Sequence, residues 1–192
     1  MTEQLSEKNS LWFNFFRQHA EEDKTVETLL SKVPIFSQLD RRELTKLAAI
    51  VHKREYTAGE LVFSKGDPGL GMYVIEEGEV EIVIAGPNGS PKVLALLETG
   101  DFFGELSLLD ESPRSATASV KHDSKIIGFF RPDLIDLLDR SPKAGTKILF
   151  KLGEVIGTRL RITNEQLAII SDELEKRSNT RGGGRNYGNR QS

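Results

Sequence analysis

The sequence predicts a mainly β fold, an antiparallel sandwich or barrel, with flanking helices and a long C-terminal helix. Between about residues 52 and 131, short alternating or β-branched runs follow one another. Nine of the 17 glycines fall between Gly59 and Gly104, mostly in the gaps between those runs. Helical apolar spacing returns on both sides of this region, whereas no helix alternates with the strands within it. A parallel sheet with crossover helices is therefore not expected.

Six runs are the expected strands, and turn residues separate them. The runs are Glu60–Phe63, Met72–Glu76, Glu79–Ala85, Lys92–Leu97, Thr117–Val120 and Lys125–Phe130. The plainest turns are Gly66–Gly69, Glu77–Gly78 and Pro87–Gly89, which carry Gly, Pro, Asp or Asn.

Residues 1–33 are expected to form an N-terminal helical extension, ending at Pro34. Its first helix carries an aromatic cluster, which consists of Trp12, Phe13, Phe15 and Phe16. This cluster either packs on the barrel or offers a docking face for an unidentified protein partner. The polar residues around it are mainly acidic, which disfavours binding to an anionic membrane surface.

After Pro34, a further helix is predicted to begin after Asp40, whose carboxylate can accept hydrogen bonds from the N–H groups of the first turn. Glu43 stands at the position that completes a capping box. Its apolar face would consist of Leu44, Leu47, Ala48 and Val51.

After Pro132, the sequence predicts a short helix over Asp133–Arg140 and a long helix over residues 141–177. Ser141 and Pro142 suit the start of the long helix. Apolar residues recur along the long helix at steps of three or four, close to the 3.5-residue repeat of a helix–helix seam. The seam consists of Leu149, Leu152, Ile156, Leu160, Leu167, Ile170 and Leu174, with Thr163 interrupting it. We expect a parallel homodimer, although such a helix can also fold back over its own barrel. The Gly/Arg-rich residues 178–192 are expected to be disordered.

Composition excludes several classes of function. The 192 residues carry a net charge of -3, include no cysteine, and contain three histidines, none in a metal-ligand pairing. Disulfides, thiol catalysis and a cupin-type metal centre are therefore not expected, and no catalytic arrangement is detectable. Without a signal peptide or an apolar run that could span a membrane, the expected location is cytoplasmic.

Chemistry is concentrated in residues 101–117. A strand-like run ends at Gly104, and residues 105–109 are predicted to form one short helical turn. The free backbone N–H groups at the start of that turn favour a bound anion. Arg114 can place a planar cation against a phosphate. Glu105 would repel that phosphate unless the ligand also offered hydroxyl donors, as a ribose next to a cyclic phosphate does. A plain ion pair between Glu105 and Arg114 is the alternative.

The run G-E-L-S-L-L-D-E-S-P-R-S-A-T, residues 104–117, resembles the phosphate-binding cassette of cyclic-nucleotide-binding domains. Further segments also resemble this family, and the resemblance covers roughly residues 33–175. These segments are Pro34–Phe36, Gly59–Phe63, Lys65–Asp67 and Met72–Val80. It implies an eight-stranded jelly roll (a cupin-like double-stranded β-helix) over residues 34–140, with flanking helices and a C-terminal dimerisation helix. The ligand-binding residues it implies are Phe103, Gly104, Glu105, Leu106, Ser107, Arg114 and Ser115.

The long helix is similar to the dimer helix of bacterial catabolite-activator relatives, and Thr163 and Asn164 match the pair that reaches the purine there. A Thr that bonds its own helix backbone is the alternative for Thr163. In those relatives a winged helix-turn-helix domain follows, where this sequence shows only the Gly/Arg-rich tail.

The resemblance implies a non-enzymatic sensor of cyclic AMP, or of cyclic GMP, that acts through other proteins and needs no metal. Two alternatives stay open. One is a jelly-roll scaffold whose pocket is empty or binds another small anion. The other is a DNA-associated regulator that uses the basic residues of its tail, Arg181, Arg185 and Arg190. Three positive charges are few for binding a nucleic acid, so this hypothesis is not favoured.

Overall fold

The computed structural model describes residues 26–86 and 88–182, with side chains up to residue 176. The aromatic cluster predicted at Trp12, Phe13, Phe15 and Phe16, and residues 183–192 of the predicted tail, lie outside the described residues. The chain divides into two compact units, Met1–Leu152 and Gly153–Ser192. We describe each unit by itself.

The described part of the first unit starts with helix α3 (Val26–Lys32), followed by the 3-10 turn η1 (Pro34–Phe36) and helix α4 (Arg41–Ala48). Both predicted helix boundaries are confirmed. Pro34 follows the end of α3, and the Asp40 side chain accepts from the Glu43 N–H at 2.9 Å. The Glu43 carboxylate in turn accepts from the Asp40 N–H at 2.8 Å, which completes the capping box. Leu47 is fully buried, so the predicted apolar face of α4 points into the protein.

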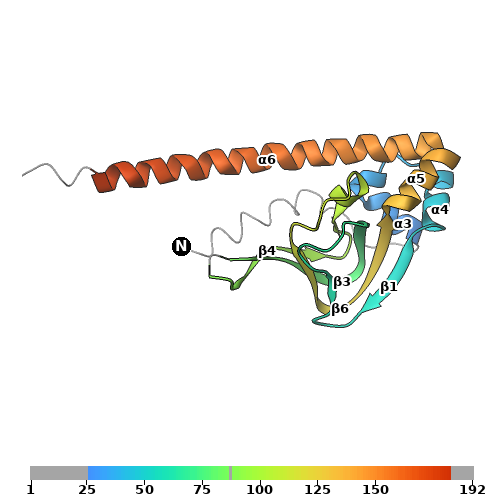
Figure 1. The fold of residues 1–192 in the computed structure, drawn as a ribbon. Coiled ribbons are helices and arrows are strands. Elements are labelled where there is room, and N and C mark those ends of the chain that lie inside the picture. The colour runs from blue at the N-terminus through green and yellow to red at the C-terminus, as the bar shows by residue number, and fades with distance from the viewer. Residues whose placement is uncertain (1–25, 87, 183–192) are drawn as a thin grey trace, which may run out of the picture. The chain divides into compact units, whose positions relative to one another are not determined.

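Within the described residues of this unit, a single antiparallel sheet of six strands lies at the centre (Figure 1). Strands β1, β6, β3 and β4 lie side by side in that order, while β2 also pairs with β6 and β5 with β3. The strands are β1 (His52–Tyr56), β2 (Leu61–Phe63), β3 (Gly71–Ala85), β4 (Pro91–Glu98), β5 (Phe102–Phe103) and β6 (Thr117–Phe130). The predicted class, antiparallel β with flanking helices, is confirmed.

The predicted turn at Glu77–Gly78 is wrong, because β3 runs through it without a break. The β3–β6 register shifts between Ile75 and Val80, so the two strands bulge together there. Gly78 adopts a φ of +108°, and the Ser124 hydroxyl on β6 accepts from the Glu79 N–H at 3.1 Å. The glycine therefore bends the strand and does not end it.

Strand β6 likewise joins the expected runs Thr117–Val120 and Lys125–Phe130. Strand β1 was not among the expected runs, whereas β5 is the strand-like run that was predicted to end at Gly104. In β1 only Tyr56 is buried and the other four residues are exposed, which gives a charged edge strand without apolar alternation. The eight strands implied by the resemblance are thus six in the described residues, since two long strands each span two expected runs.

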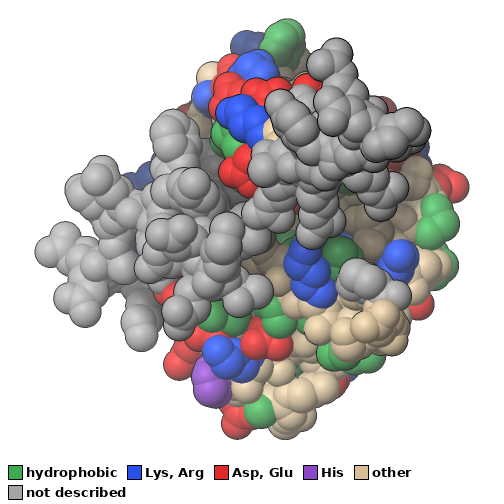
Figure 2. All heavy atoms as spheres, turned by 90° about the vertical axis from the view of Figure 1, so that its left-hand side faces the viewer, with side chains coloured by type: hydrophobic (Ala, Val, Ile, Leu, Met, Phe, Trp, Pro, Cys, Tyr) green, Lys and Arg blue, Asp and Glu red, His purple; other side chains and the backbone are tan. Residues whose placement is uncertain are grey.

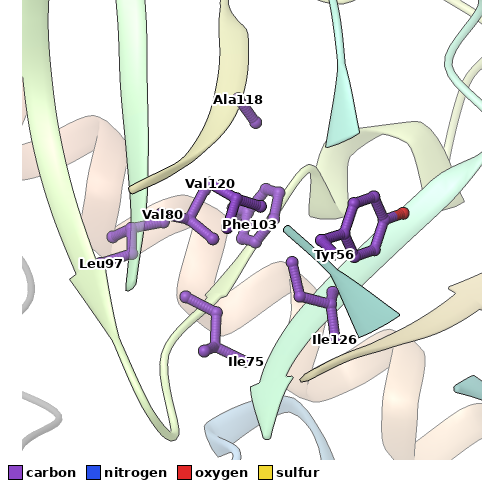
Figure 3. Close-up of a cluster of buried hydrophobic side chains, with 8 residues drawn as sticks. All are labelled: Tyr56, Ile75, Val80, Leu97, Phe103, Ala118, Val120 and Ile126. Atoms are coloured by element: carbon purple, nitrogen blue, oxygen red, sulfur yellow. The ribbon is translucent and has the colours of Figure 1, made fainter. Parts of the chain in front are cut away.

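The sheet encloses a core of apolar side chains from five of its strands (Figure 3). Phe103 of β5 lies within this cluster and is 5% exposed. The cluster consists of Tyr56, Ile75, Val80, Leu97, Phe103, Ala118, Val120 and Ile126. A second apolar layer lies under the helices, where the rings of Phe36 and Phe129 meet edge to face at 5.8 Å.

Helix α5 (Arg131–Arg140) begins two residues before the predicted start, because the Asp133 carboxylate accepts from the Phe130 N–H at 3.0 Å and caps the earlier turn. Helix α6 runs from Pro142 to Gly182, so the prediction that order ends at residue 177 is wrong for residues 178–182. That stretch contains no proline, and each added helical residue gains a backbone hydrogen bond. No helix within the described ranges is both long and apolar enough to cross a lipid bilayer.

The first turns of α6 belong to the first unit, where Ala144, Ile148 and Leu152 are fully buried. The assignment of Leu152 to an intermolecular seam is therefore wrong, because this residue packs within its own chain. Leu149 is half-buried. The remaining seam residues lie in the second unit, where Leu160, Leu167, Ile170 and Leu174 are exposed and Ile156 is half-buried.

Candidate nucleotide site

The predicted anion-binding segment lies between β5 and β6. Strand β5 ends at Phe103, Gly104 adopts left-handed backbone angles (φ +75°, ψ +15°), and Glu105–Leu108 form a 3-10 turn. The predicted helical turn is confirmed, although it is a 3-10 turn. Glu105 and Ser107 are 4% and 5% exposed, whereas the Leu106 side chain points to solvent.

Arg114 is the central residue of the segment and is 6% exposed. Its backbone is fixed by the turn after β2, since its N–H donates to the Asp67 carbonyl and its carbonyl accepts from the Gly66 N–H, both at 2.9 Å. The side chain then turns inward. Nη1 donates to Ser107 Oγ at 2.9 Å and to the Gly104 carbonyl at 3.2 Å, and Nη2 donates to the Gly71 carbonyl at 2.8 Å.

Two aromatic rings flank the guanidinium. Its central carbon lies 4.1 Å from the centre of the Phe63 ring and 5.6 Å from that of Tyr73. These are distances at which a ring face attracts a cation. Tyr73 also stacks on Phe103 at 5.4 Å, so the rings are themselves held by the barrel core. Sequence reasoning missed Phe63, Tyr73 and Gly71, because no spacing along the chain relates them to Arg114.

Burial lowers the pKa of Arg114 from its ordinary value, because desolvation disfavours the charged form. Tyr73, Asp67 and Glu105 act in the opposite direction. The Nε–H group is buried and finds no acceptor among the described residues. A buried donor without a partner is costly, so this guanidinium has unused capacity for an acceptor such as a phosphate oxygen.

Gly104 is required by this geometry for a second reason besides its backbone angles. A Cβ atom at this position would lie 2.6 Å from Arg114 Nη1 and 3.3 Å from the Gly71 carbonyl oxygen. Only a glycine lets the strand end and the guanidinium approach this closely.

The structure brings Gly104, Ser107 and Arg114 into contact, with Glu105 beside them and Phe103 in the core beneath. Ser115 is exposed, although it follows Arg114 directly. Thr163 and Asn164 lie in the second unit and are exposed. The Thr163 hydroxyl donates to the Arg159 carbonyl at 3.0 Å, the local bond weighed for it above. A role for this pair in contacting the purine stays a prediction.

Three lysines on the surface of the sheet are paired with neighbouring carboxylates. Lys53, Lys121 and Lys125 pair with Glu76, Glu79 and Glu77 at 2.6, 2.8 and 2.9 Å. On the face shown in Figure 2, acidic and basic side chains are interspersed among the described residues. No three His, Asp or Glu side chains of the described part of the chain gather as a metal site would require.

Comparison with known proteins agrees with this site. The family described as cyclic nucleotide-binding domain matches residues 53–141. The cyclic AMP receptor protein of Thermus thermophilus is 33% identical over 140 residues, which are 73% of this chain and 63% of that protein. The cAMP-dependent protein kinase regulatory subunit of Schizosaccharomyces pombe is 39% identical over 125 residues, 62% of this chain and 29% of that protein. This chain thus spans less than two thirds of either relative.

A solved structure shows the same fold. The N-terminal domain of a transcriptional regulator from Streptomyces coelicolor superposes with a TM-score of 0.63 at 32% identity. The match covers 71% of this chain and 95% of that domain. The fold, the cassette and these relatives agree, and they place residues 53–141 of this chain in the cyclic nucleotide-binding domain family.

Proposed function

We propose that this chain is a sensor of a 3′,5′-cyclic nucleotide, with cyclic AMP as the favoured ligand, which signals through contacts of its long helix. The observation that carries the proposal is the guanidinium of Arg114, which is buried and has an Nε–H without an acceptor among the described residues. Such a group favours a bound anion, and a cyclic phosphate carries one negative charge.

Each part of the nucleotide has a candidate partner. Arg114 would meet the cyclic phosphate, together with backbone N–H groups of residues 105–107. Glu105 would accept from the ribose 2′-hydroxyl, which explains an acid so close to a phosphate. Ser115 is exposed and free of a structural role in the core, so it is a candidate for a further phosphate or purine contact.

Thr163 and Asn164 are our candidates for the purine. Both side chains are exposed on α6, and the Asn164 amide can both donate to and accept from an adenine edge. Both relatives are named for cyclic AMP, which supports the choice of this nucleotide.

The second unit supports an output through a helix. Leu160, Leu167, Ile170 and Leu174 are exposed along one face of α6. An apolar stripe of this length is best buried against a second copy, and we propose a parallel homodimer. A ligand that contacts α6 would bias the position of that helix, and so the surface presented to a protein partner.

The test is calorimetric titration of the full chain with cyclic AMP, cyclic GMP and a cyclic dinucleotide, after removal of carried-over nucleotide. We expect saturable binding of cyclic AMP, and at least about 2 kcal/mol of it to be lost in Arg114→Gln. Arg114→Lys is the matched variant, since it keeps the positive charge without the planar fork. Absence of binding to all three nucleotides at millimolar concentration would refute the proposal and leave the scaffold alternative.

A further inference from the structure

Ser107 stands out among the cassette residues because its hydroxyl points at a protein group. The Ser107 side chain is 5% exposed, and its Oγ accepts from Arg114 Nη1 at 2.9 Å. The resemblance implied that Ser107 contacts the ligand through the backbone of residues 105–107, and it assigned no role to the hydroxyl. In the structure its side-chain oxygen is engaged by the guanidinium.

The three hydrogen bonds of the Arg114 side chain differ in whether a substitution can remove the acceptor. Two acceptors, the carbonyl oxygens of Gly71 and Gly104, belong to the backbone. The third is Ser107 Oγ, a side-chain atom. Nη1 is shared between Ser107 and Gly104, and the bond to Ser107 is the shorter of the two. Ser107 therefore fixes the rotation of the guanidinium plane more directly than Gly104 does.

The space around Ser107 also restricts its side chain. A Cβ added at Gly69 would overlap the Ser107 hydroxyl and would lie 2.6 Å from the Ser112 carbonyl oxygen. The loop before β3 is thus packed against the cassette at Ser107. A hydroxyl held in one place by its surroundings is a fixed acceptor, and a fixed acceptor orients its donor.

We propose that Ser107 is a positioning residue: it holds the Arg114 guanidinium in one orientation in the ligand-free protein, so that Nε–H faces the place of the phosphate. This inference rests on the proposed function and deepens it. Ordering a long, flexible arginine side chain before binding removes an entropic cost from the binding step. The Ser107 hydroxyl would then raise the affinity for a cyclic nucleotide without touching it.

The first test needs no ligand. In the full chain with ¹⁵N-labelled arginine, two separate Nη resonances are expected for Arg114, because its hydrogen bonds slow the rotation about the Nε–Cζ bond that exchanges Nη1 with Nη2. Arg114→Lys assigns these signals. Ser107→Ala is expected to merge them. The matched control is Ser112→Ala, which removes a neighbouring hydroxyl that bonds to Asp110 within the described residues, and it should leave the two resonances separate. Two unchanged resonances in folded Ser107→Ala would overturn the inference.

The second test is a double-mutant cycle with cyclic AMP as the probe. Ser107→Ala is expected to weaken binding about tenfold in the wild-type background. In the Arg114→Gln background the same change should alter the affinity less than about twofold, since a residue that acts through Arg114 has nothing left to position. An equal loss in both backgrounds would mean that Ser107 contacts the nucleotide itself. If the wild-type chain binds no cyclic nucleotide, the proposed function fails, while the resonance test still decides whether Ser107 holds the guanidinium.

Discussion

Gly104 and Arg114 are ten residues apart in sequence and in direct contact in the structure. Arg114 Nη1 donates to the Gly104 carbonyl at 3.2 Å and occupies the space in which a side chain at position 104 would begin. The glycine both ends β5 in a left-handed conformation and makes room for the cation. A substitution at position 104 is therefore expected to displace the Arg114 guanidinium.

Gly104→Ala should weaken both the fold and the binding of cyclic AMP. The left-handed backbone costs an alanine about 1–2 kcal/mol, and the Cβ would also displace the Arg114 guanidinium. We expect at least about a tenfold loss of affinity by calorimetry. Gly89→Ala is the matched control, because Gly89 has the same φ of +75° and, apart from its chain neighbours, no described residue has a heavy atom within 4 Å of its added Cβ. Equal effects of the two changes on binding would contradict the close approach at Gly104.

Gly78→Ala should destabilise the sheet by more than about 2 kcal/mol. Its φ of +108° disfavours alanine, and the new Cβ would lie 2.6 Å from Ser124 Cβ and 2.8 Å from Ser124 Cα on β6. Those atoms move only if the two long strands separate. Urea unfolding measures the effect, and Gly59→Ala, with a φ of +85° and open space around it, isolates the backbone strain. A Gly78→Ala variant no less stable than Gly59→Ala would disprove the proposed clash.

The Asp40 cap predicts a loss of stability in acid. The hydrogen bond from the Glu43 N–H lowers the pKa of Asp40 from its model-compound value of 3.8. Asp40 therefore stabilises the folded state above the unfolded pKa, and this contribution is lost as the pH falls through the folded pKa. Unfolding free energies should be measured between pH 6 and pH 2 for the wild type and Asp40→Asn. Asparagine caps without titrating, so the stability difference between the two proteins should shrink as the pH falls below about 4. A pH-independent difference would exclude this linkage.

The exposed face of α6 predicts an association that one charge can break. Leu167→Glu places a carboxylate in the middle of the stripe formed by Leu160, Leu167, Ile170 and Leu174. We expect the mass from light scattering to fall from that of a dimer to that of a monomer, since an unpaired buried charge opposes association. Ala168→Glu adds the same charge at an exposed position beside the stripe and should leave the dimer intact. A monomeric wild type, or a dimer in Leu167→Glu, would contradict the seam.

Features set by neighbouring residues could be predicted from the sequence. The capping box at Asp40 and Glu43 depends on residues three apart, and the break at Pro34 on one ring that lacks an N–H. The turn at Gly104 follows from glycine itself. These hydrogen bonds form within a few residues, so their pattern is legible along the chain.

The tertiary structure decided what depends on residues brought together from far apart. Ser124 holds the bulge at Gly78 from 46 positions away, which turned an expected turn into a continuous strand. Gly71, Phe63 and Tyr73 complete the surroundings of Arg114 from 41 to 51 positions away. Leu152 has the spacing of a seam residue and is buried in its own unit instead. Periodicity shows which side chains avoid water, but only the pairing of strands and the packing of helices decides what covers them, because that choice depends on the geometry of the whole core.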